Sequence, residues 1–187
     1  VEYLSGIATC AAELLGAARR AHPDAGVVCT RKNVPGTKRA ALKAILCAGA
    51  SPHRISLSET LLIFPEHRAF LPPDESPAAT LARLRRQWPE RPVVVEVAQA
   101  ADALAWAAAG VDILQLEKMS PDTVAALHAQ ISAGPGHPRL AAAGGITPAN
   151  AEAYVRAGAR ILVTSAPYFA PPKDVAVTLT PADEPRS

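Results

Sequence analysis

Residues 93–131 read VVVEVAQAADALAWAAAGVDILQLEKMSPDTVAALHAQI, and in this stretch two strand-like runs alternate with two helix-like segments. The runs at 93–97 and 112–116 are short and almost continuously apolar, which is typical of strands buried on both faces of a parallel sheet. The segments at 100–110 and 120–131 carry apolar residues at helical spacing. A helical crossover returns the chain to the end where the first strand began, so the second strand runs parallel to it. The stretch therefore predicts a repeating β-α unit.

The same alternation continues over most of the 187-residue chain. Further strand-length apolar runs lie at 27–29, 60–64, 140–143 and 161–164, and a helical pattern leads the chain at 1–22. Parallel strands joined by right-handed helical crossovers form either a closed barrel or a doubly wound sheet. Six strands behind a leading helix favour the barrel. We therefore expect an α/β protein with a parallel βα barrel of fewer than eight strands.

Helix boundaries are marked by capping residues. Ser76, Ser120 and Thr147 each directly precede a proline at the start of a helical pattern. The hydroxyl can accept a hydrogen bond from a free amide of the first turn, and a proline at the first helical position has no amide to leave unbonded. We expect these three residues to be helix N-caps.

The two ends of the chain differ in character. Residues 1–170 carry the barrel pattern, whereas residues 171–187 form a proline-rich tail with one alternating run, Val175–Leu179. We expect that run to be an edge strand whose partner lies outside this sequence. The helical pattern is already in progress at Val1, which indicates a fragment or a trimmed chain.

Composition excludes several classes of function. A net charge of +2, without aromatic residues alternating with basic ones, argues against nucleic-acid binding. No segment reaches the roughly 18 uninterrupted apolar residues of a membrane-spanning helix, so we expect no membrane insertion. Cys10, Cys29 and Cys47 are odd in number and lie in apolar surroundings, which favours reduced, buried thiols over disulfides or a zinc site. A cytoplasmic location is expected from that cysteine usage.

Positive charge is concentrated near the amino-terminal end. No acidic residue falls between Asp24 and Glu59, while six basic residues do: Arg31, Lys32, Lys38, Arg39, Lys43 and Arg54. The helical pattern at 37–49 places Lys38, Arg39 and Lys43 on a solvated outer face. The others lie at the ends of elements, where they could bind an anion.

In a parallel βα barrel the functional site forms at the carboxyl ends of the strands. The residues that follow or close the predicted strands are Arg31 and Lys32, Phe64, Glu96, Glu117, Gly144 and Gly145, and Ser165, with His53 and Arg54 just before the second strand. These side chains are therefore the candidate site.

The stretch AAAGGITPAN at 141–150 brings together a strand, two glycines and a predicted helix start. That arrangement can direct free backbone amides at an anion and favours a phosphate site. A glycine pair in such a turn can equally be needed for backbone freedom alone.

Glu96 lies inside an otherwise apolar strand, where a carboxylate is costly to bury unless it is paired or used. Glu117 ends the next strand, and two neighbouring carboxylates suit Mg²⁺ or the hydroxyls of a sugar. The structural alternatives are that Glu117 pairs with Lys118 in solvent and that Glu96 pairs with a buried cation such as Lys32.

Five motifs, in this order and spacing, resemble the catalytic barrel of the quinolinate phosphoribosyltransferase family, the nicotinate-nucleotide pyrophosphorylases. They are SGIAT at 5–9, TRKNVPG at 30–36, HRISLSETLLIFPEH at 53–67, VVVEV at 93–97 and GGIT at 144–147. The sequences at 58–71 and 163–175 resemble a paralogous pyrophosphorylase branch, associated with molybdenum transport, more than they resemble the quinolinate enzyme itself. The resemblance extends from Leu4 to about Thr178.

The resemblance implies a type II phosphoribosyltransferase that uses Mg²⁺, phosphoribosyl diphosphate and an acidic heterocyclic acceptor. It implies an amino-terminal sandwich domain ahead of the barrel, and a homodimer in which the sandwich domain of one subunit completes the site of the other. That domain is expected to be largely missing here, together with an arginine that it supplies, and Val175–Leu179 would return to it.

The resemblance also assigns roles by motif. Arg31, His53 and Arg54 would hold the carboxylates of the acceptor, and Lys32 would bind phosphate or pyrophosphate. Glu96 and Glu117 would hold the ribose hydroxyls and Mg²⁺. Gly144, Gly145 and Ser165 would bind the 5-phosphate.

The chain departs from the family pattern at three positions in the proposed pocket. Phe64 stands where the quinolinate enzyme has a lysine, Glu117 where it has an aspartate, and Ala143 where it has a serine. Phe64 would face the acceptor, or else point into the core while another cation such as Lys38 replaces the lysine. We therefore expect this protein to share the reaction class of the quinolinate enzyme, and less so its substrate.

Two other functions fit part of the pattern. A non-catalytic accessory protein that binds an anionic metabolite is favoured by Phe64, whereas the retained Glu96 and Glu117 favour catalysis. Another phosphate-binding barrel, such as an epimerase, would explain GGIT but would leave the pairs Arg31–Lys32 and His53–Arg54 without a role.

Overall fold

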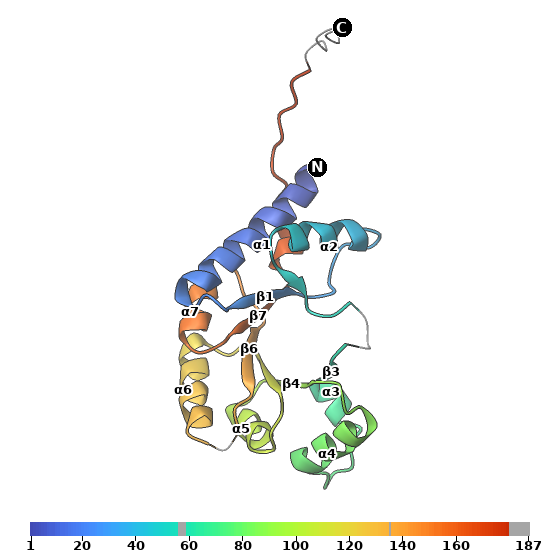
Figure 1. Cartoon of the computed structure of the whole chain (residues 1–187), viewed down its shortest axis with the longest axis vertical. Helices are drawn as coiled ribbons and strands as arrows, with labels where there is room; N and C mark the ends of the chain where they lie inside the picture. The colour runs from blue at the N-terminus through green and yellow to red at the C-terminus, as the bar shows by residue number, and fades with distance from the viewer. Residues whose placement is uncertain (56–58, 135, 180–187) are drawn as a thin grey trace.

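The computed structural model describes residues 1–55, 59–134 and 136–179. One sheet of seven parallel strands organises these residues, in the order β2-β1-β7-β6-β5-β4-β3 (Figure 1). The strands are β1 (Gly26–Cys29), β2 (Ser51–Pro52), β3 (Leu61–Ile63), β4 (Val93–Val97), β5 (Ile113–Glu117), β6 (Arg139–Ala143) and β7 (Ile161–Thr164). The sheet curls with β2 and β3 as its two edges, so it forms a partly open barrel. The predicted parallel barrel of fewer than eight strands is confirmed, and the two-residue strand β2 was not predicted.

The helices lie around the outside of the curled sheet (Figure 1). They are α1 (Glu2–Ala21), α2 (Lys38–Cys47), α3 (Pro65–Arg68), α4 (Pro77–Gln87), α5 (Ala100–Ala108), α6 (Pro121–Ser132) and α7 (Ala151–Arg156), followed by the 3₁₀ helix η1 (Ala166–Phe169). No helix in the described part of the chain combines the length and apolarity needed to cross a membrane.

The strands bury side chains on both faces, because successive side chains of a strand point to opposite sides. In β4, Val93, Val95 and Val97 belong to the large core between sheet and helices. Val94 points the other way, into a small apolar cluster inside the barrel with Leu62, Ile113, Ala141, Ala143 and Val163. Glu96, two residues after Val94, is therefore directed to the inner side, above that cluster.

Two of the three predicted N-caps are confirmed. The hydroxyl oxygens of Ser76 and Ser120 accept hydrogen bonds, each 3.2 Å long, from the backbone amides three residues later. The prediction for Thr147 is wrong, because α7 begins only at Ala151, after a turn. Asn150 closes that turn: its Oδ1 accepts from the amide of Thr147 at 2.8 Å, and its Nδ2 donates to the carbonyl of Gly145 at 2.9 Å.

Val175–Leu179 is predicted to be an edge strand whose partner lies outside this sequence, and nothing in the described residues tests that prediction. The tail leaves the body of the protein beside the amino-terminal end of α1 (Figure 1), where the Lys173 amide donates to the Glu2 carbonyl at 3.1 Å. Beyond that contact, residues 175–179 pair with no strand in the described segments, so no ladder of hydrogen bonds supports them. A single strand needs a partner to be stable, so the strand at 175–179 stays a prediction for the chain with its partner present.

All three cysteines are free thiols, as predicted. Burial of Cys29 in the core raises the pKa of its thiol to about 12. Cys10 is half-buried, and Cys47 is exposed at the end of α2, so the expectation that all three are buried is wrong for Cys47. The adjacent Leu46 is exposed as well, so apolar residues at the end of α2 do not mark a buried face.

Two glycines in α1 provide a test of how the tail packs. A methyl group at Gly16 would meet nothing within 4 Å, so Gly16→Ala should raise the free energy of unfolding by about 0.5 to 1 kcal/mol, the usual helical gain. A methyl group at Gly6 would lie 2.3 Å from the carbonyl oxygen of Pro171, which is backbone and must move. Gly6→Ala should therefore cost about 1 to 3 kcal/mol of stability, as overpacking does, in urea unfolding of both variants. Equal stabilisation by the two substitutions would show that the tail does not pack on α1 in solution.

Candidate active site

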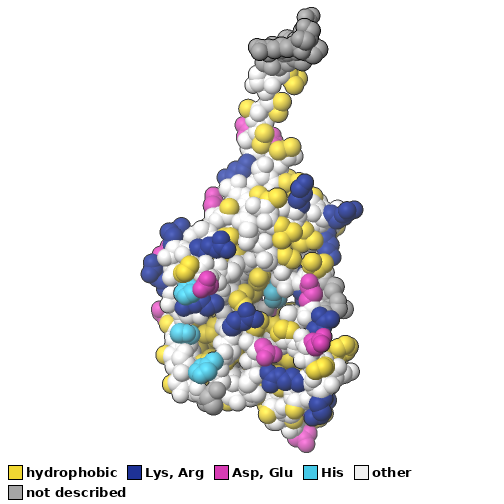
Figure 2. All heavy atoms as spheres, viewed as in Figure 1, with side chains coloured by type: hydrophobic (Ala, Val, Ile, Leu, Met, Phe, Trp, Pro, Cys, Tyr) yellow, Lys and Arg dark blue, Asp and Glu magenta, His cyan; other side chains and the backbone are white. Residues whose placement is uncertain are grey.

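A cavity of about 850 Å³ opens at the carboxyl ends of the strands, above the apolar cluster inside the barrel. All of the candidate site residues line it: Arg31, Lys32, His53, Arg54, Phe64, Glu96, Glu117, Gly144, Gly145 and Ser165. Figure 2 shows that basic and acidic side chains are interspersed over the visible face of the molecule. The cavity itself is lined by basic and acidic side chains from segments that are distant in the sequence.

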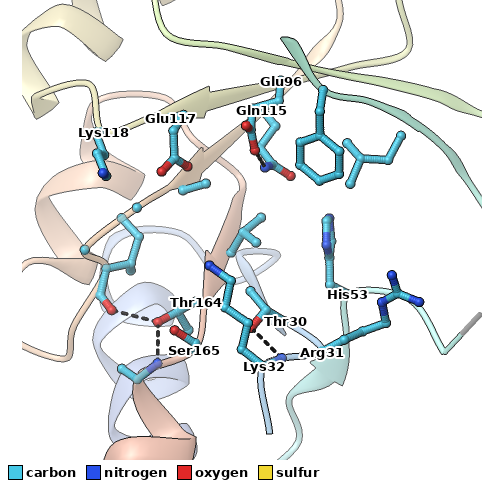
Figure 3. Close-up of a pocket in the computed structure, with 18 of the residues that line it drawn as sticks. Thr30, Arg31, Lys32, His53, Glu96, Gln115, Glu117, Lys118, Thr164 and Ser165 are labelled. Atoms are coloured by element: carbon cyan, nitrogen blue, oxygen red, sulfur yellow. Dashed lines mark hydrogen bonds between the residues drawn. The ribbon is translucent and has the colours of Figure 1, made fainter. Parts of the chain in front are cut away.

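The ends of β1 and β2 supply the basic side of the cavity. The amide of Thr30 donates to the Thr164 carbonyl at 2.9 Å, and the amide of His53 donates to the Cys29 carbonyl at 2.7 Å. These bonds prolong the pairing of β1 with both neighbours and fix the loops from which Lys32 and His53 extend (Figure 3). Burial, and then the nearby guanidinium groups of Arg54 and Arg31, lower the pKa of His53. At neutral pH the His53 imidazole is therefore uncharged.

The ends of β4 and β5 supply carboxylates on the opposite side (Figure 3). Glu96 and Gln115 are register partners in the sheet, and Gln115 Nε2 donates to Glu96 Oε2 at 2.5 Å. Partial burial raises the pKa of the Glu96 carboxyl, and the neighbouring Glu117 carboxylate raises it further. Glu96 thus lies where a cation would be strongly favoured.

Both structural alternatives for the carboxylates are wrong. Among the described residues, no salt bridge joins Glu96 to Lys32 or Glu117 to Lys118. The ion pairs that do form lie outside the cavity. The charged groups of the cavity are therefore held near one another without neutralising contacts, as in a site prepared for a charged ligand.

The turn after β6 needs glycine at position 144 for two reasons. Its φ is +82°, and a Cβ atom there would lie 2.7 Å from Glu117 Oε1 and 2.6 Å from Lys118 Cγ. Gly145 also has a positive φ, of 80°. The interpretation that the pair provides backbone freedom is confirmed, and the turn passes directly beside the end of β5.

Ser165 follows β7 and lines the cavity next to Thr164. The Thr164 hydroxyl donates to the Ile146 carbonyl at 2.8 Å and accepts from the amide of Ala166 at 3.0 Å. These bonds tie the glycine turn to the start of η1, so that Gly145 and Ser165 are held at one end of the cavity.

Phe64 is half-buried, lines the cavity and packs against the inner apolar cluster. Its amide donates to His67 Nδ1 at 3.0 Å. Lys38 does not replace the missing lysine: its Nζ donates to the Ile55 carbonyl at 3.4 Å and does not line the cavity. The position that carries a lysine in the quinolinate enzyme is therefore apolar here.

Sequence reasoning missed several residues of the cavity, among them Glu66, Gln115, Lys118 and Thr164. A signal for Gln115 was present, because it lies two residues before Glu117 in a strand and so shares its face. Lys118 was considered only as a partner of Glu117. The role of Thr164 depends on hydrogen bonds that no sequence pattern indicates.

The partly open parallel barrel, with cations, carboxylates and a glycine turn at its carboxyl end, defines a phosphoribosyltransferase-type barrel. The chain belongs to the quinolinate phosphoribosyltransferase family, because residues 7–178 match the domain described as Quinolinate phosphoribosyl transferase, C-terminal domain.

Among its relatives are the ModD proteins, which carry the provisional name of pyrophosphorylases. The chain is 51% identical over 163 residues to ModD of Rhodobacter capsulatus, a match that covers 86% of this chain and 61% of the relative. It is 40% identical over 184 residues to ModD of Escherichia coli O6:H1, covering 97% of this chain and 64% of the relative. ModD is the paralogous branch expected from the sequences at 58–71 and 163–175, so that resemblance is confirmed.

The fold is similar to that of NadC from Streptococcus pyogenes, with a TM-score of 0.78 and 27% sequence identity. That likeness covers 93% of this chain and 59% of the solved chain. The chain thus spans about three fifths of the length of the proteins it matches.

Lys118 has a backbone conformation that lysine rarely adopts, with φ of 53° and its amide donating to the Ala143 carbonyl at 2.8 Å. An L-residue in this left-handed region costs roughly 1 to 2 kcal/mol. We expect Lys118→Gly to be more stable than Lys118→Ala by about 1 kcal/mol in urea unfolding, because only glycine relieves that cost. Equal stability of the two variants would contradict a strained backbone at this position.

Proposed function

We propose that this protein transfers the phosphoribosyl group of phosphoribosyl diphosphate to an acidic heterocyclic acceptor and releases pyrophosphate. The observation that carries the proposal is a single cavity in which the carboxylates of Glu96 and Glu117, several cations and a glycine turn converge on the carboxyl ends of the strands. Membership of the quinolinate phosphoribosyltransferase family supports the reaction class.

The anionic parts of the donor would bind at two places. The turn at Gly144 and Gly145, with Ser165 beside it, would take the 5-phosphate through backbone amides and the hydroxyl. Lys32 and Lys118 would bind the diphosphate, since both line the cavity and neither forms a salt bridge within the described structure. Their charge would stabilise the departing pyrophosphate.

Glu96 and Glu117 would hold Mg²⁺ together with the ribose hydroxyls. The fit rests on the two carboxylates lining one cavity and on the raised pKa of Glu96, which burial and Glu117 cause and which a cation would lower. The described residues contain no cluster of three metal-ligating side chains. Two protein carboxylates completed by substrate phosphates are a usual Mg²⁺ arrangement. When bound, the ion would offset negative charge on the leaving pyrophosphate.

The acceptor would bind on the basic side. Arg31 and Arg54 can hold a planar carboxylate through paired N–H donors, and the uncharged His53 can add a hydrogen bond. The ring nitrogen of the acceptor would attack the anomeric carbon while the bond to pyrophosphate breaks. Positive character would then develop on the ribose, and the carboxylate of Glu96 would stabilise it.

The competing function is a non-catalytic accessory protein that binds an anionic metabolite, which Phe64 favours. A homodimer completed by an amino-terminal sandwich domain, a cytoplasmic location and a link to molybdenum transport remain predictions based on the family resemblance and on cysteine usage.

The test is to incubate the full-length protein with phosphoribosyl diphosphate, Mg²⁺ and a panel of pyridine and other heterocyclic acids, and to measure pyrophosphate release. At least one acid should support release. Glu96→Gln should lower turnover roughly a hundredfold, because the charge matters most in the transition state. The affinity for phosphoribosyl diphosphate, titrated separately, should change much less. Equal turnover by both forms would favour the accessory protein.

Phe64 should make quinolinate a poor substrate. Without the lysine, a carboxylate of quinolinate loses one charge-assisted hydrogen bond, worth about 1.5 to 3 kcal/mol, or roughly ten- to a hundredfold. Phe64→Lys in the full-length protein should therefore raise kcat/KM for quinolinate by about that factor. Phe70→Lys, at a residue that is 90% exposed and does not line the cavity, is the matched control. Efficient use of quinolinate by the unchanged protein would show that Phe64 does not face the acceptor.

A further inference from the structure

Gln115 is the polar side chain at the floor of the cavity. It is only 4% exposed and follows Ile113 on the inner face of β5, directly above the apolar cluster. In the sheet it lies between Glu96 on β4 and Ala141 on β6. Of these two neighbours, only Glu96 can form a hydrogen bond with the amide side chain.

The hydrogen bond to Glu96 fixes which end of the amide faces the carboxylate. A carboxylate only accepts hydrogen bonds, so the NH₂ group of Gln115 must point at it, as it does at 2.5 Å. The Oε1 atom of Gln115 then points away from Glu96. It is buried and has no hydrogen-bond partner among the described residues.

Buried polar atoms are normally satisfied, so an orphan oxygen in a ligand cavity calls for a donor. The apolar neighbours of this region, Ala141 and Phe64, cannot donate from their side chains. Gln115 and Phe64 line the same cavity, and Phe64 is the position that carries a lysine in the quinolinate enzyme. A ligand that reaches this region must bring the donor itself.

We propose that Gln115 selects an acceptor that is a planar heteroaromatic monocarboxylate carrying an N–H or O–H donor, which Gln115 Oε1 accepts. The inference rests on the proposed function in taking the ligand to be the acceptor of phosphoribosyl transfer. In that transfer the lone pair of the ring nitrogen forms the new bond to the anomeric carbon, and pyrophosphate leaves with the electron pair of the broken C–O bond. The donor group keeps its proton and orients the ring.

The test compares acids of equal shape that differ in one donor. Binding of 2- and 6-aminonicotinate and of 2- and 6-methylnicotinate to the full-length protein is measured by calorimetry in the presence of Mg²⁺ and pyrophosphate. At least one aminonicotinate should bind about tenfold or more tightly than its methyl counterpart, because only the amino group satisfies Oε1. In Gln115→Met, which has similar volume but no amide, the two should bind within about threefold of each other.

Each other result is informative. If Gln115 merely positions Glu96, Gln115→Met will weaken both members of a pair equally, and the inference is wrong. Lack of an amino preference in the unchanged protein, or no binding of any of the four acids at millimolar concentration, also overturns it, even where Gln115→Met does not fold. Pyrophosphate release is scored separately. Transfer without amino preference removes this inference alone. Amino preference without transfer to any acid removes the proposed function, and leaves Gln115 as the selector of a donor-bearing ligand that is not an acceptor.

Discussion

The register of β4, β5 and β6 is the constraint on which the cavity depends. Parallel pairing sets Glu96 opposite Gln115, and Gln115 opposite Ala141, while Val94 pairs with Ile113 one step below. Because side chains alternate along a strand, a shift of one residue would exchange the inner and outer faces. It would send Glu96 into the helix-covered core and empty the cavity of its carboxylate. The apolar cluster inside the barrel therefore holds the polar layer above it in place.

That polar layer contains energetically unfavourable features, and the surrounding structure holds them in place. Glu96 is half-buried beside a second carboxylate, and the pKa of Glu96 is raised as a result. Lys118 occupies a left-handed conformation, and Gly144 lies too close to Glu117 to carry a side chain. Unfavourable features of this kind concentrate at functional sites, where the rest of the fold over-determines them. Here the well-packed strands and the Thr164 hydrogen bonds provide that support.

Much of the fold could be predicted from local patterns, because buried parallel strands and amphipathic helices carry strong periodic signals. The failures occurred where tertiary contacts decide. Strand β2 has only two residues, and α7 starts three residues late because Asn150 closes a turn. Most of the charged residues that line the cavity could be named in advance, since the sequence shows where each strand ends. Gln115 and Lys118 were missed because their importance arises from an unsatisfied oxygen and a backbone angle, which exist only in three dimensions.

In the proposed phosphoribosyl transfer, the parts of the cavity that fit the family pattern and the parts that depart from it would contact different regions of the reacting complex. Lys32, Glu96 and the glycine turn are suited to a donor whose phosphates and ribose are the same for every acceptor. Phe64 and Gln115 lie at the inner floor, where an apolar ring and an orphan hydrogen-bond acceptor would replace a positive charge in recognising the proposed acceptor. A lysine favours any anionic oxygen, whereas an orphan carbonyl oxygen rejects one and requires a donor. If the proposed acceptor binds there, the floor would therefore disfavour a second carboxylate twice, once by lacking the positively charged partner and once by presenting the negative end of an amide dipole.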